Sequence, residues 1–322
     1  MNISTLSLPV LYHPSMDILD STKLQTYQSC PRLFFYEYIL GWRSSRPNNH
    51  LHFGKCLHLA LEHIIMNDYT TDSVVEALDL FNEEYRMEFP EATDDIYKPK
   101  IPKNFFDCLI KYIKQYSDDP IIYEVYKTEF GGTISLDDSH KLAFKMDTVL
   151  RKRSTGKYCS LEHKSKGGNY IGDNYIFEHL MGIQCGTYTH VLNTLVPPED
   201  VEGVIINCLC FKKTKIPDYI LQRFPIHLNN SQMYSWLLNT ISWMDRIYSD
   251  FQHLSATRVE DDVMTAFPRN GRSCCNWGRT CAFLDLCLHV NNPLQIQNRI
   301  PVDMKVEFWN PLEEDLRETL TL

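Results

Sequence analysis

The spacing of apolar residues changes from a helical period to a strand period and back, and this order restricts the chain to few folds. Helical spacing predicts helices over residues 21–40, 51–66, 72–89 and 104–116, the first of them interrupted at Pro31. Alternation then predicts strands over residues 122–130, 142–151, 157–163, 201–211 and 219–228. Helices are also predicted over residues 177–195 and 230–254. This order predicts an α/β (α+β) fold, in which helices flank a central mixed β-sheet.

A chain of 322 residues has enough material for one large core, and we expect a single domain over residues 1–322. Its expected parts are N-terminal helices (20–66), a helical insertion (67–120), a sheet core (121–228), a long helix with a cysteine-rich segment (229–290) and an acidic tail (291–322). No apolar run approaches the roughly 18 residues of a membrane helix. The N-terminus does not resemble a secretory signal, so we expect a cytoplasmic protein, or one in the host-cell cytoplasm if it is viral.

The formal net charge of -9 is unevenly distributed. Residues 67–95 contain ten acids and one base, and residues 307–322 carry a further net charge of -4. The rest of the chain is therefore slightly basic, and an anionic partner stays compatible with the sequence. The acidic residues of 72–90 and of the tail predict a solvated surface or a contact with a protein partner.

Two carboxylates occur in adjacent predicted strands. Asp147 lies in FKMDTVL, and Glu162 and Lys164 end the next strand in LEHK. Alternation places Glu162 and Lys164 on one side of their strand, and a hairpin would bring Asp147 to Glu162. Two carboxylates at that distance favour a hard cation such as Mg2+ or Mn2+, and a lysine beside them can orient water or offset phosphoryl charge. The alternative is an ordinary solvated strand face.

Three further polar side chains lie on predicted helices. His58 shares a helix face with Gly54 and Glu62, and an imidazole there can complete a cation site. Gln184 and Tyr188 form an i, i+4 pair that can donate hydrogen bonds to phosphate or base. In isolation, such residues are more often core or surface residues without a ligand.

Four of the eleven cysteines, Cys274, Cys275, Cys281 and Cys287, lie within fourteen residues. In a chain without a signal peptide, this crowding favours metal or cluster ligation over disulfides. Three of these thiolates and the remote Cys30 would satisfy a four-coordinate site. The spacing fits Zn2+ as well as an iron–sulfur cluster.

Six segments, in order, resemble motifs of the RecB-type iron–sulfur branch of the PD-(D/E)XK nuclease superfamily, which includes AddB-type nuclease domains and exonucleases of CRISPR adaptation. The segments are LQTYQSCPRLFFY, FGKCLHLALE, FKMDTV, LEHK, QCGTY and CCNWGRTCAFLDLC. The resemblance covers about residues 20–290.

This resemblance implies a divalent-metal-dependent DNA exonuclease that acts on single strands, frayed ends or duplex ends. It implies that His58, Asp147, Glu162 and the main-chain carbonyl of His163 bind Mg2+ or Mn2+, and that Lys164 is catalytic. Gln184 and Tyr188 would position DNA. Cys30, Cys274, Cys281 and Cys287 would hold a [4Fe–4S] cluster, with Cys274 preferred to Cys275. The pathway stays open among DNA repair, recombination, CRISPR adaptation and viral DNA metabolism.

The sequence departs from the family pattern in two places. The first gap of the terminal cysteine segment is longer than in many relatives, and no glycine directly precedes Asp147. An alternative from another functional class is a catalytically inactive nucleic-acid-binding or recombination scaffold with a structural metal site made of four cysteines.

Overall fold

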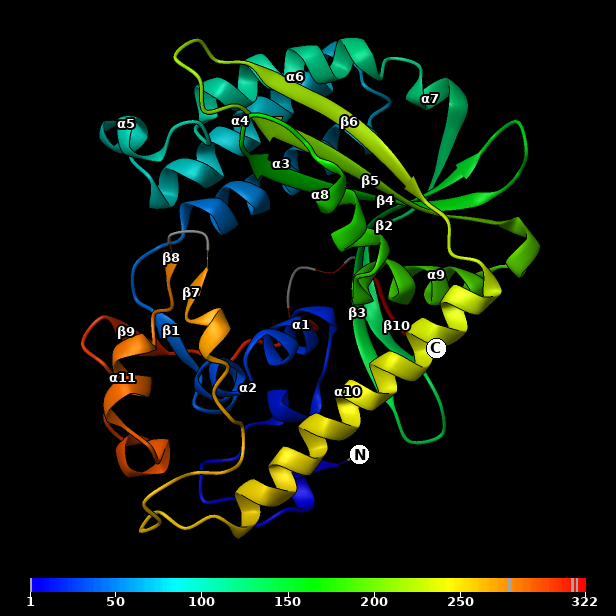
Figure 1. Ribbon diagram of the computed structural model, residues 1–322. Helices are drawn as coiled ribbons and strands as arrows, with labels where there is room; N and C mark the ends of the chain where they lie inside the picture. Colours follow the sequence, from blue (N-terminus) through cyan, green and yellow to red (C-terminus); the bar gives the residue numbers. More distant parts are fainter. Residues whose placement is uncertain (1, 277–278, 314–315, 317) are drawn as a thin grey trace.

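The computed structural model describes residues 2–276, 279–313, 316 and 318–322. Residues 314, 315 and 317 of the expected acidic tail lie outside this description. The central sheet has six strands in the order β10-β2-β3-β4-β5-β6 (Figure 1). They are β2 (Tyr123–Ser135), β3 (Lys141–Lys152), β4 (Tyr158–Gly167), β5 (Val201–Phe211), β6 (Tyr219–Ile226) and β10 (Glu318–Thr321). The pairs β4–β5 and β10–β2 are parallel and the other pairs antiparallel, which confirms the predicted mixed sheet.

Helices cover both faces of this sheet. The longer ones are α1 (Ser21–Ser29), α3 (Asn49–Met66), α4 (Thr71–Glu88), α6 (Pro102–Gln115), α8 (Asp173–Leu180), α9 (Ile183–Leu195) and α10 (Asn230–Ala256). Within the described residues, no helix combines the length and apolar character needed to cross a membrane. The acids Asp72, Glu76 and Asp79 are exposed on α4, as a solvated helix face requires.

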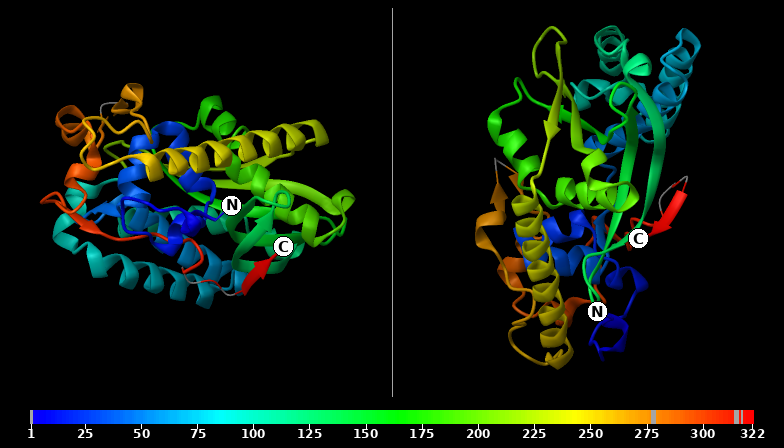
Figure 2. Two further views of the ribbon diagram at one scale, coloured as in Figure 1. Left: turned by 90° about the horizontal axis from the view of Figure 1, so that it is seen from below. Right: turned by 90° about the vertical axis from the view of Figure 1, so that its right-hand side faces the viewer.

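Alternate residues of the strands enter the two main hydrophobic cores. On one face, Leu209 and Phe211 of β5 pack with apolar residues of α3, α4 and α6. On the other face, Met146 of β3 and Ile206 of β5 pack with residues of α1, α9 and α10. Figure 2 shows α10 running along the side of the molecule opposite α4. The period-two alternation of the strands therefore determines which helices each side chain meets.

The helix predicted over 21–40 is broken where proline requires it. Helix α1 ends at Ser29, Cys30 is extended with φ -160°, and α2 (Pro31–Phe34) begins at the proline. The prediction of one helix over 177–195 is wrong, because the chain forms α8 and α9 with Gly182 at the N-cap of α9.

The C-terminal region contributes strands that the sequence pattern did not predict. Strand β9 (Met304–Val306) pairs with β1 (Trp42–Ser44), and β10 adds an edge to the main sheet beside β2. Hydrogen bonds also join the ends of the chain, because Asn270 Nδ2 and Ser273 Oγ both donate to the carbonyl of Ser29 at 2.7 Å. The lower half of Figure 1 shows these N- and C-terminal segments side by side.

Helices α9 and α10 meet at Gly186. The Trp236 side chain lies directly over it and donates from Nε1 to the carbonyl of Ile183 at 3.0 Å. A Cβ atom at Gly186 would lie 2.2 Å from the Trp236 ring. The close approach of the two helices therefore requires glycine at this position.

We predict that Gly186→Ala lowers the free energy of unfolding by about 1–3 kcal/mol, because the Trp236 ring must move away from α9. Gly54→Ala on α3 is the matched control, because the nearest atom to its added Cβ is Ser165 Oγ at 4.0 Å. Alanine there should stabilise the helix by up to about 1 kcal/mol. Urea unfolding of both variants measures the difference, and equal effects would contradict the packing argument.

Candidate active site

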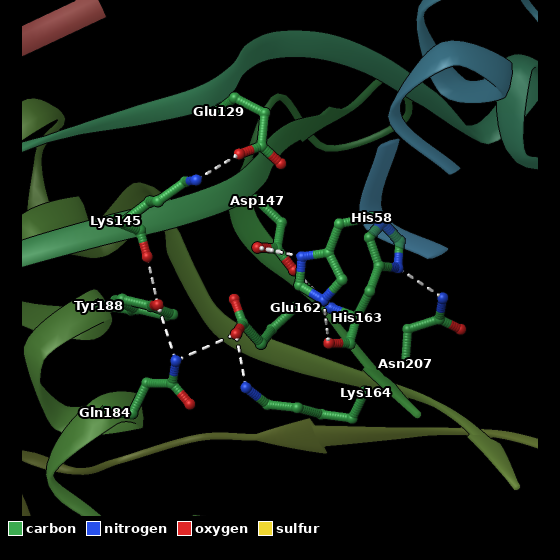
Figure 3. A network of polar contacts seen from close by, with 10 residues as sticks. All are labelled: His58, Glu129, Lys145, Asp147, Glu162, His163, Lys164, Gln184, Tyr188 and Asn207. Carbon is green, nitrogen blue, oxygen red and sulfur yellow. Dashed lines mark hydrogen bonds and ion pairs between the residues drawn. The ribbon is translucent and has the colours of Figure 1, made fainter. Parts of the chain in front are cut away.

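The candidate active site lies where β3 and β4 separate. Their ladder runs from Arg151↔Tyr158 to Thr148↔Leu161 and ends there. Strand β3 continues beside β2, whereas β4 continues beside β5 as far as Gly167↔Phe211. The next residues in register after the last pair are Asp147 and Glu162. Their carboxylates therefore enter the fork from facing strands, as Figure 3 shows.

His58 reaches the fork from α3. Its Nδ1 lies 3.2 Å from Asp147 Oδ1, and its Nε2 lies 3.0 Å from the main-chain carbonyl oxygen of His163. The second oxygen of Asp147 accepts from the main-chain N–H of His163 at 2.7 Å. His163 thus contributes both its backbone groups to the site. Its ring points away from the Glu162 and Lys164 side of β4 and packs edge-on against the His58 ring, with the ring centroids 5.9 Å apart.

Glu162 is held from two sides through one of its oxygens. Its Oε1 accepts from Lys164 Nζ at 2.7 Å and from Gln184 Nε2 at 3.0 Å. Gln184 Nε2 also lies 2.8 Å from the hydroxyl of Tyr188, which in turn donates to the carbonyl of Lys145. The structure therefore brings the residues proposed from the sequence for catalysis, cation binding and DNA contact to the same fork, in two hydrogen-bonded sets that meet at the adjacent residues Glu162 and His163.

The structure adds Glu129, which the sequence did not single out. Glu129 lies on β2, where Thr128 pairs with Thr148 and Phe130 with Met146, so it faces Asp147. Single ligand atoms of His58, Glu129 and Asp147 all lie within 4.8 Å of one another, close enough for one ion. Glu129 also pairs with Lys145 at 3.2 Å.

The identity of that facing residue depends on an irregularity in β2. The register shifts between Val125 and Lys127, and Glu129 itself has φ +40°. Without the shift, a different residue of β2 would face Asp147. The signal in the sequence, an acid in the preceding strand, is therefore interpretable only once the register is known.

Burial and mutual charge shift the pKa values of these groups. Burial raises the pKa of Glu162 to about 7, and the charge of Asp147 adds to that effect. The same two causes raise the pKa of Glu129 to about 7. Burial also acts to raise the pKa of Asp147, but attraction and hydrogen bonding to His58 reverse the shift and lower it. The site therefore favours a positive charge close to these carboxylates.

His58 supplies that charge in the absence of a cation. Burial alone would lower the pKa of His58, but the charge and hydrogen bond of Asp147, together with the charge of Glu162, raise it to about 9. Both ring nitrogens face acceptors, which an imidazolium satisfies with two protons. A cation bound by the imidazole would displace one of these protons.

The carboxylates, the imidazole and the carbonyl of His163 suit Mg2+ or Mn2+ by their chemistry. Glu162 provides a further indication, because its Oε2 is buried and has no hydrogen-bond partner among the described residues. A buried carboxylate oxygen without a partner costs free energy unless a ligand binds to it. The residues present therefore fit a divalent cation.

Four cysteines form a second cluster, next to the hydrogen bonds that join Ser29 to Asn270 and Ser273. Cys30, Cys274, Cys281 and Cys287 line one small cavity, together with Tyr36 and Arg269. The N–H of Cys281 donates to the carbonyl of Cys274 at 2.8 Å, and the N–H of Asn270 lies 3.4 Å from Cys30 Sγ. Cys275 lies on the short strand β7 (Cys275–Asn276) and is exposed. The geometry thus separates Cys274 from its neighbour.

Comparison with known proteins identifies the superfamily of the chain. The model of the PD-(D/E)XK nuclease superfamily matches residues 21–288, so the chain belongs to that superfamily. No curated protein is significantly similar to it in sequence. Among solved structures, a crystal structure described as a "Putative exonuclease" from Eubacterium rectale is 12% identical, with a TM-score of 0.45. That match covers 87% of this chain and 97% of the other.

The shifted pKa of His58 predicts a pH-dependent contribution to stability in metal-free protein. The folded-state pKa of about 9 lies above the ordinary value of about 6.5. The stabilisation is therefore complete below pH 6.5 and is lost as the pH rises through 9. The stability difference between wild type and His58→Gln, measured by urea unfolding in EDTA, should shrink over that range.

The control is His63→Gln, the same substitution on the same helix, where His63 pairs with the exposed Glu76 at 2.8 Å. This variant should not reproduce the pH dependence of His58→Gln. A stability difference for His58→Gln that stays constant from pH 6 to 9.5 would contradict the electrostatic role of the imidazolium.

Proposed function

We propose that the protein is a divalent-metal-dependent DNA exonuclease of the RecB-type branch, acting on single strands or frayed ends. The observation that carries this proposal is the convergence of His58, Asp147, Glu162 and Lys164 at the fork between β3 and β4. DNA repair, recombination, CRISPR adaptation and viral DNA metabolism are the pathways that such an activity would serve.

His58, Asp147, Glu129, Glu162 Oε2 and the carbonyl of His163 are the groups proposed to hold Mg2+ or Mn2+. A divalent cation there supplies Lewis acidity, which activates water and stabilises charge on the scissile phosphate. Because the two glutamates have raised pKa values, their full deprotonation depends on that positive charge. The carboxylates themselves fix the position of the cation relative to the phosphate.

Lys164 acts as a cation in this proposal. Burial acts to lower its pKa, but the charges of Glu162 and Asp147 outweigh burial and raise it. A protonated ammonium donates hydrogen bonds and cannot accept a proton. Its side chain is 26% exposed, so it can contact the attacking water or a phosphate oxygen while Glu162 fixes its position. Its contribution is orientation and charge stabilisation.

Gln184 and Tyr188 differ in burial, and we propose different roles for them. Tyr188 is 4% exposed and reaches the site through Gln184, so we propose that it orients the glutamine. Gln184 is half-buried and contacts Glu162 directly, which leaves it as the member of the pair available to DNA. Beyond the site, Lys166 continues the side of β4 that carries Lys164, which supports binding of a polyanion.

The alternative of an inactive nucleic-acid-binding scaffold has less support. Such a protein needs no buried carboxylates facing one another, because their burial costs free energy without contributing to binding. Here ligand atoms of His58, Glu129 and Asp147 lie within 4.8 Å of one another, and Glu162 and Lys164 pair with each other at the same fork. The set as a whole is what cleavage requires.

We predict that Glu162→Gln and Lys164→Met each reduce cleavage of end-labelled DNA at least about a hundredfold, because each removes a charge used in the transition state. The assay compares anaerobically purified protein without metal and after addition of Mn2+ or Mg2+. Lys157→Met, just before the opposite end of β4, is the matched control and should retain activity. Unchanged cleavage in both site variants would contradict the proposal.

We further propose that Cys30, Cys274, Cys281 and Cys287 hold a [4Fe–4S] cluster. The four thiols line one small cavity, so each of them can supply a ligand there. Three cysteines close together in the sequence and one remote cysteine are the ligand set that the family resemblance implies for such a cluster. The same four thiolates would also fit a single zinc ion, and metal analysis separates the two.

The adjacent cysteines provide a direct test of this assignment. Cys274→Ser should lose most of the iron and the visible absorption of anaerobically purified protein, because an alcohol replaces a ligand. Cys275→Ser should retain both, since Cys275 is exposed beside the cavity. Metal analysis and absorption spectra measure the outcome. A colourless wild-type protein that contains zinc would contradict the cluster.

A further inference from the structure

A row of buried polar side chains lies directly behind the candidate cation site. His163 on β4 is in register with Asn207 on β5, and Asn207 is in register with Arg223 on β6. Their side chains therefore share the sheet face that packs against α3 and α6. Asp119, at the start of α7 (Asp119–Ile122), closes the row. Figure 3 shows the end of this row at His163 and Asn207.

Continuous hydrogen bonds join the four residues. Arg223 Nη1 donates to Asp119 Oδ1 at 2.8 Å, and Arg223 Nε donates to Asn207 Oδ1 at 3.2 Å. Asn207 Nδ2 lies 2.8 Å from His163 Nδ1. The hydroxyl of Tyr112 also lies 3.0 Å from both Asn207 Nδ2 and Arg223 Nη2.

The donor and acceptor roles in this row have only one consistent direction. A guanidinium only donates, so Asn207 must turn its oxygen toward Arg223 and its NH2 group toward His163. His163 Nδ1 must then accept, which leaves the ring proton on Nε2 and the imidazole neutral. A neutral ring places no positive charge behind the cation that Asp147 and Glu162 are proposed to bind.

Such a row is a costly element of a β-sheet core. Asn207 is 0% and His163 1% exposed, and the Nε2 atom of His163 has no hydrogen-bond partner within the described residues. An apolar side chain at position 163 would avoid the burial of a polar nitrogen without a partner. The row must therefore contribute through the groups that it holds in position.

What the row holds is the peptide backbone of β4 at the site. On the fork side, no strand among the described residues pairs with β4 beyond Leu161, so ladder hydrogen bonds to β3 no longer fix its position. The main-chain N–H of His163 donates to Asp147, and its carbonyl faces His58. A rotation of this residue would displace both groups.

We propose that Asp119, Arg223, Asn207 and the His163 ring form a positioning network that fixes the His163 peptide for cation binding. This inference rests on the proposed metal site and deepens it. None of the four side chains is proposed to contact DNA or the reacting atoms. The network acts through the His163 backbone, through the carboxylate that its N–H orients and through the edge-on contact of the His163 ring with the His58 ring.

The test measures Mn2+ affinity of the full-length protein by electron paramagnetic resonance, without DNA. Asn207→Leu should weaken Mn2+ binding about tenfold or more, which is the effect typical of residues that orient metal ligands. Asn104→Leu is the matched control, because Asn104 is also buried and donates to the carbonyl of Pro99 at 2.9 Å, in the segment before α6. It should lower the melting temperature while keeping Mn2+ affinity within twofold.

A double-mutant cycle with His163→Leu separates positioning from general loss of stability. If the His163 ring acts through Asn207, the double variant should bind Mn2+ no more weakly than the weaker-binding single variant. Cleavage should recover toward the wild-type kcat at high Mn2+, since the reacting groups are intact. If Asn207→Leu fails to fold, Arg223→Lys serves instead, because it keeps the charge but not the planar fork of donors.

The outcomes distinguish this inference from the proposed function. Wild-type protein that binds no Mn2+ would overturn the metal site itself. If the wild type binds Mn2+ and the affinity of Asn207→Leu or Arg223→Lys for Mn2+ lies within twofold of the wild-type value, the network alone is overturned. Fully additive losses in the double variant would also overturn it, because they would show that the two side chains act independently.

Discussion

The mutual repulsion of buried carboxylates is the constraint on which the rest of the site depends. Asp147, Glu129 and Glu162 approach one another inside a protein core, where charge is poorly solvated. In the metal-free state, His58 meets this cost by presenting both ring nitrogens to acceptors and carrying a proton. Lys164 offsets the charge of Glu162 by donating a hydrogen bond to its carboxylate. The site is thus built for positive charge, and protons occupy the positions that a cation would compete for.

The fork in the sheet is what makes such an arrangement possible. Had β3 and β4 remained paired, the His163 backbone would be used in ladder hydrogen bonds. Because the ladder ends at Thr148↔Leu161, the N–H and carbonyl of His163 are directed at side chains of the site. The β4–β5 ladder continues past this point and keeps β4 extended. One edge of β4 is therefore fixed by its ladder with β5, while the other edge directs backbone groups to the site.

Much of this could be predicted from the sequence, because it depends on local periodicity. The hairpin pattern placed Asp147 near Glu162, and helical spacing placed His58 on one helix face with Gly54 and Glu62. Glu129 was missed because its register depends on an irregularity between Val125 and Lys127 that has no clear signature in the sequence. Strand β10 was missed for a related reason, since four residues at an edge carry too little alternation to indicate pairing.

The cysteine cluster and the site are connected through packing rather than through direct contact. Pro31 forces the break between α1 and α2 that places Cys30 at a corner, next to the C-terminal segment. Helix α1 is in turn anchored to α10, because the Tyr27 hydroxyl donates to Asp250 Oδ2 at 2.6 Å. Helix α10 packs on α9 through Trp236 and Gly186, and α9 carries Gln184 to Glu162.

A ligand shared by Cys30 and the three C-terminal thiols would therefore hold together the outer layer of helices that supports α9. Its loss would release α1 and the C-terminal segment first, since the fork is formed by strands whose own ladders are independent of the cysteines. The carboxylates of β2, β3 and β4 would then remain together, while α9, which carries Gln184, would lose its packing against α1. The thiol cluster can thus affect how Glu162 is oriented without taking part in the chemistry at the fork.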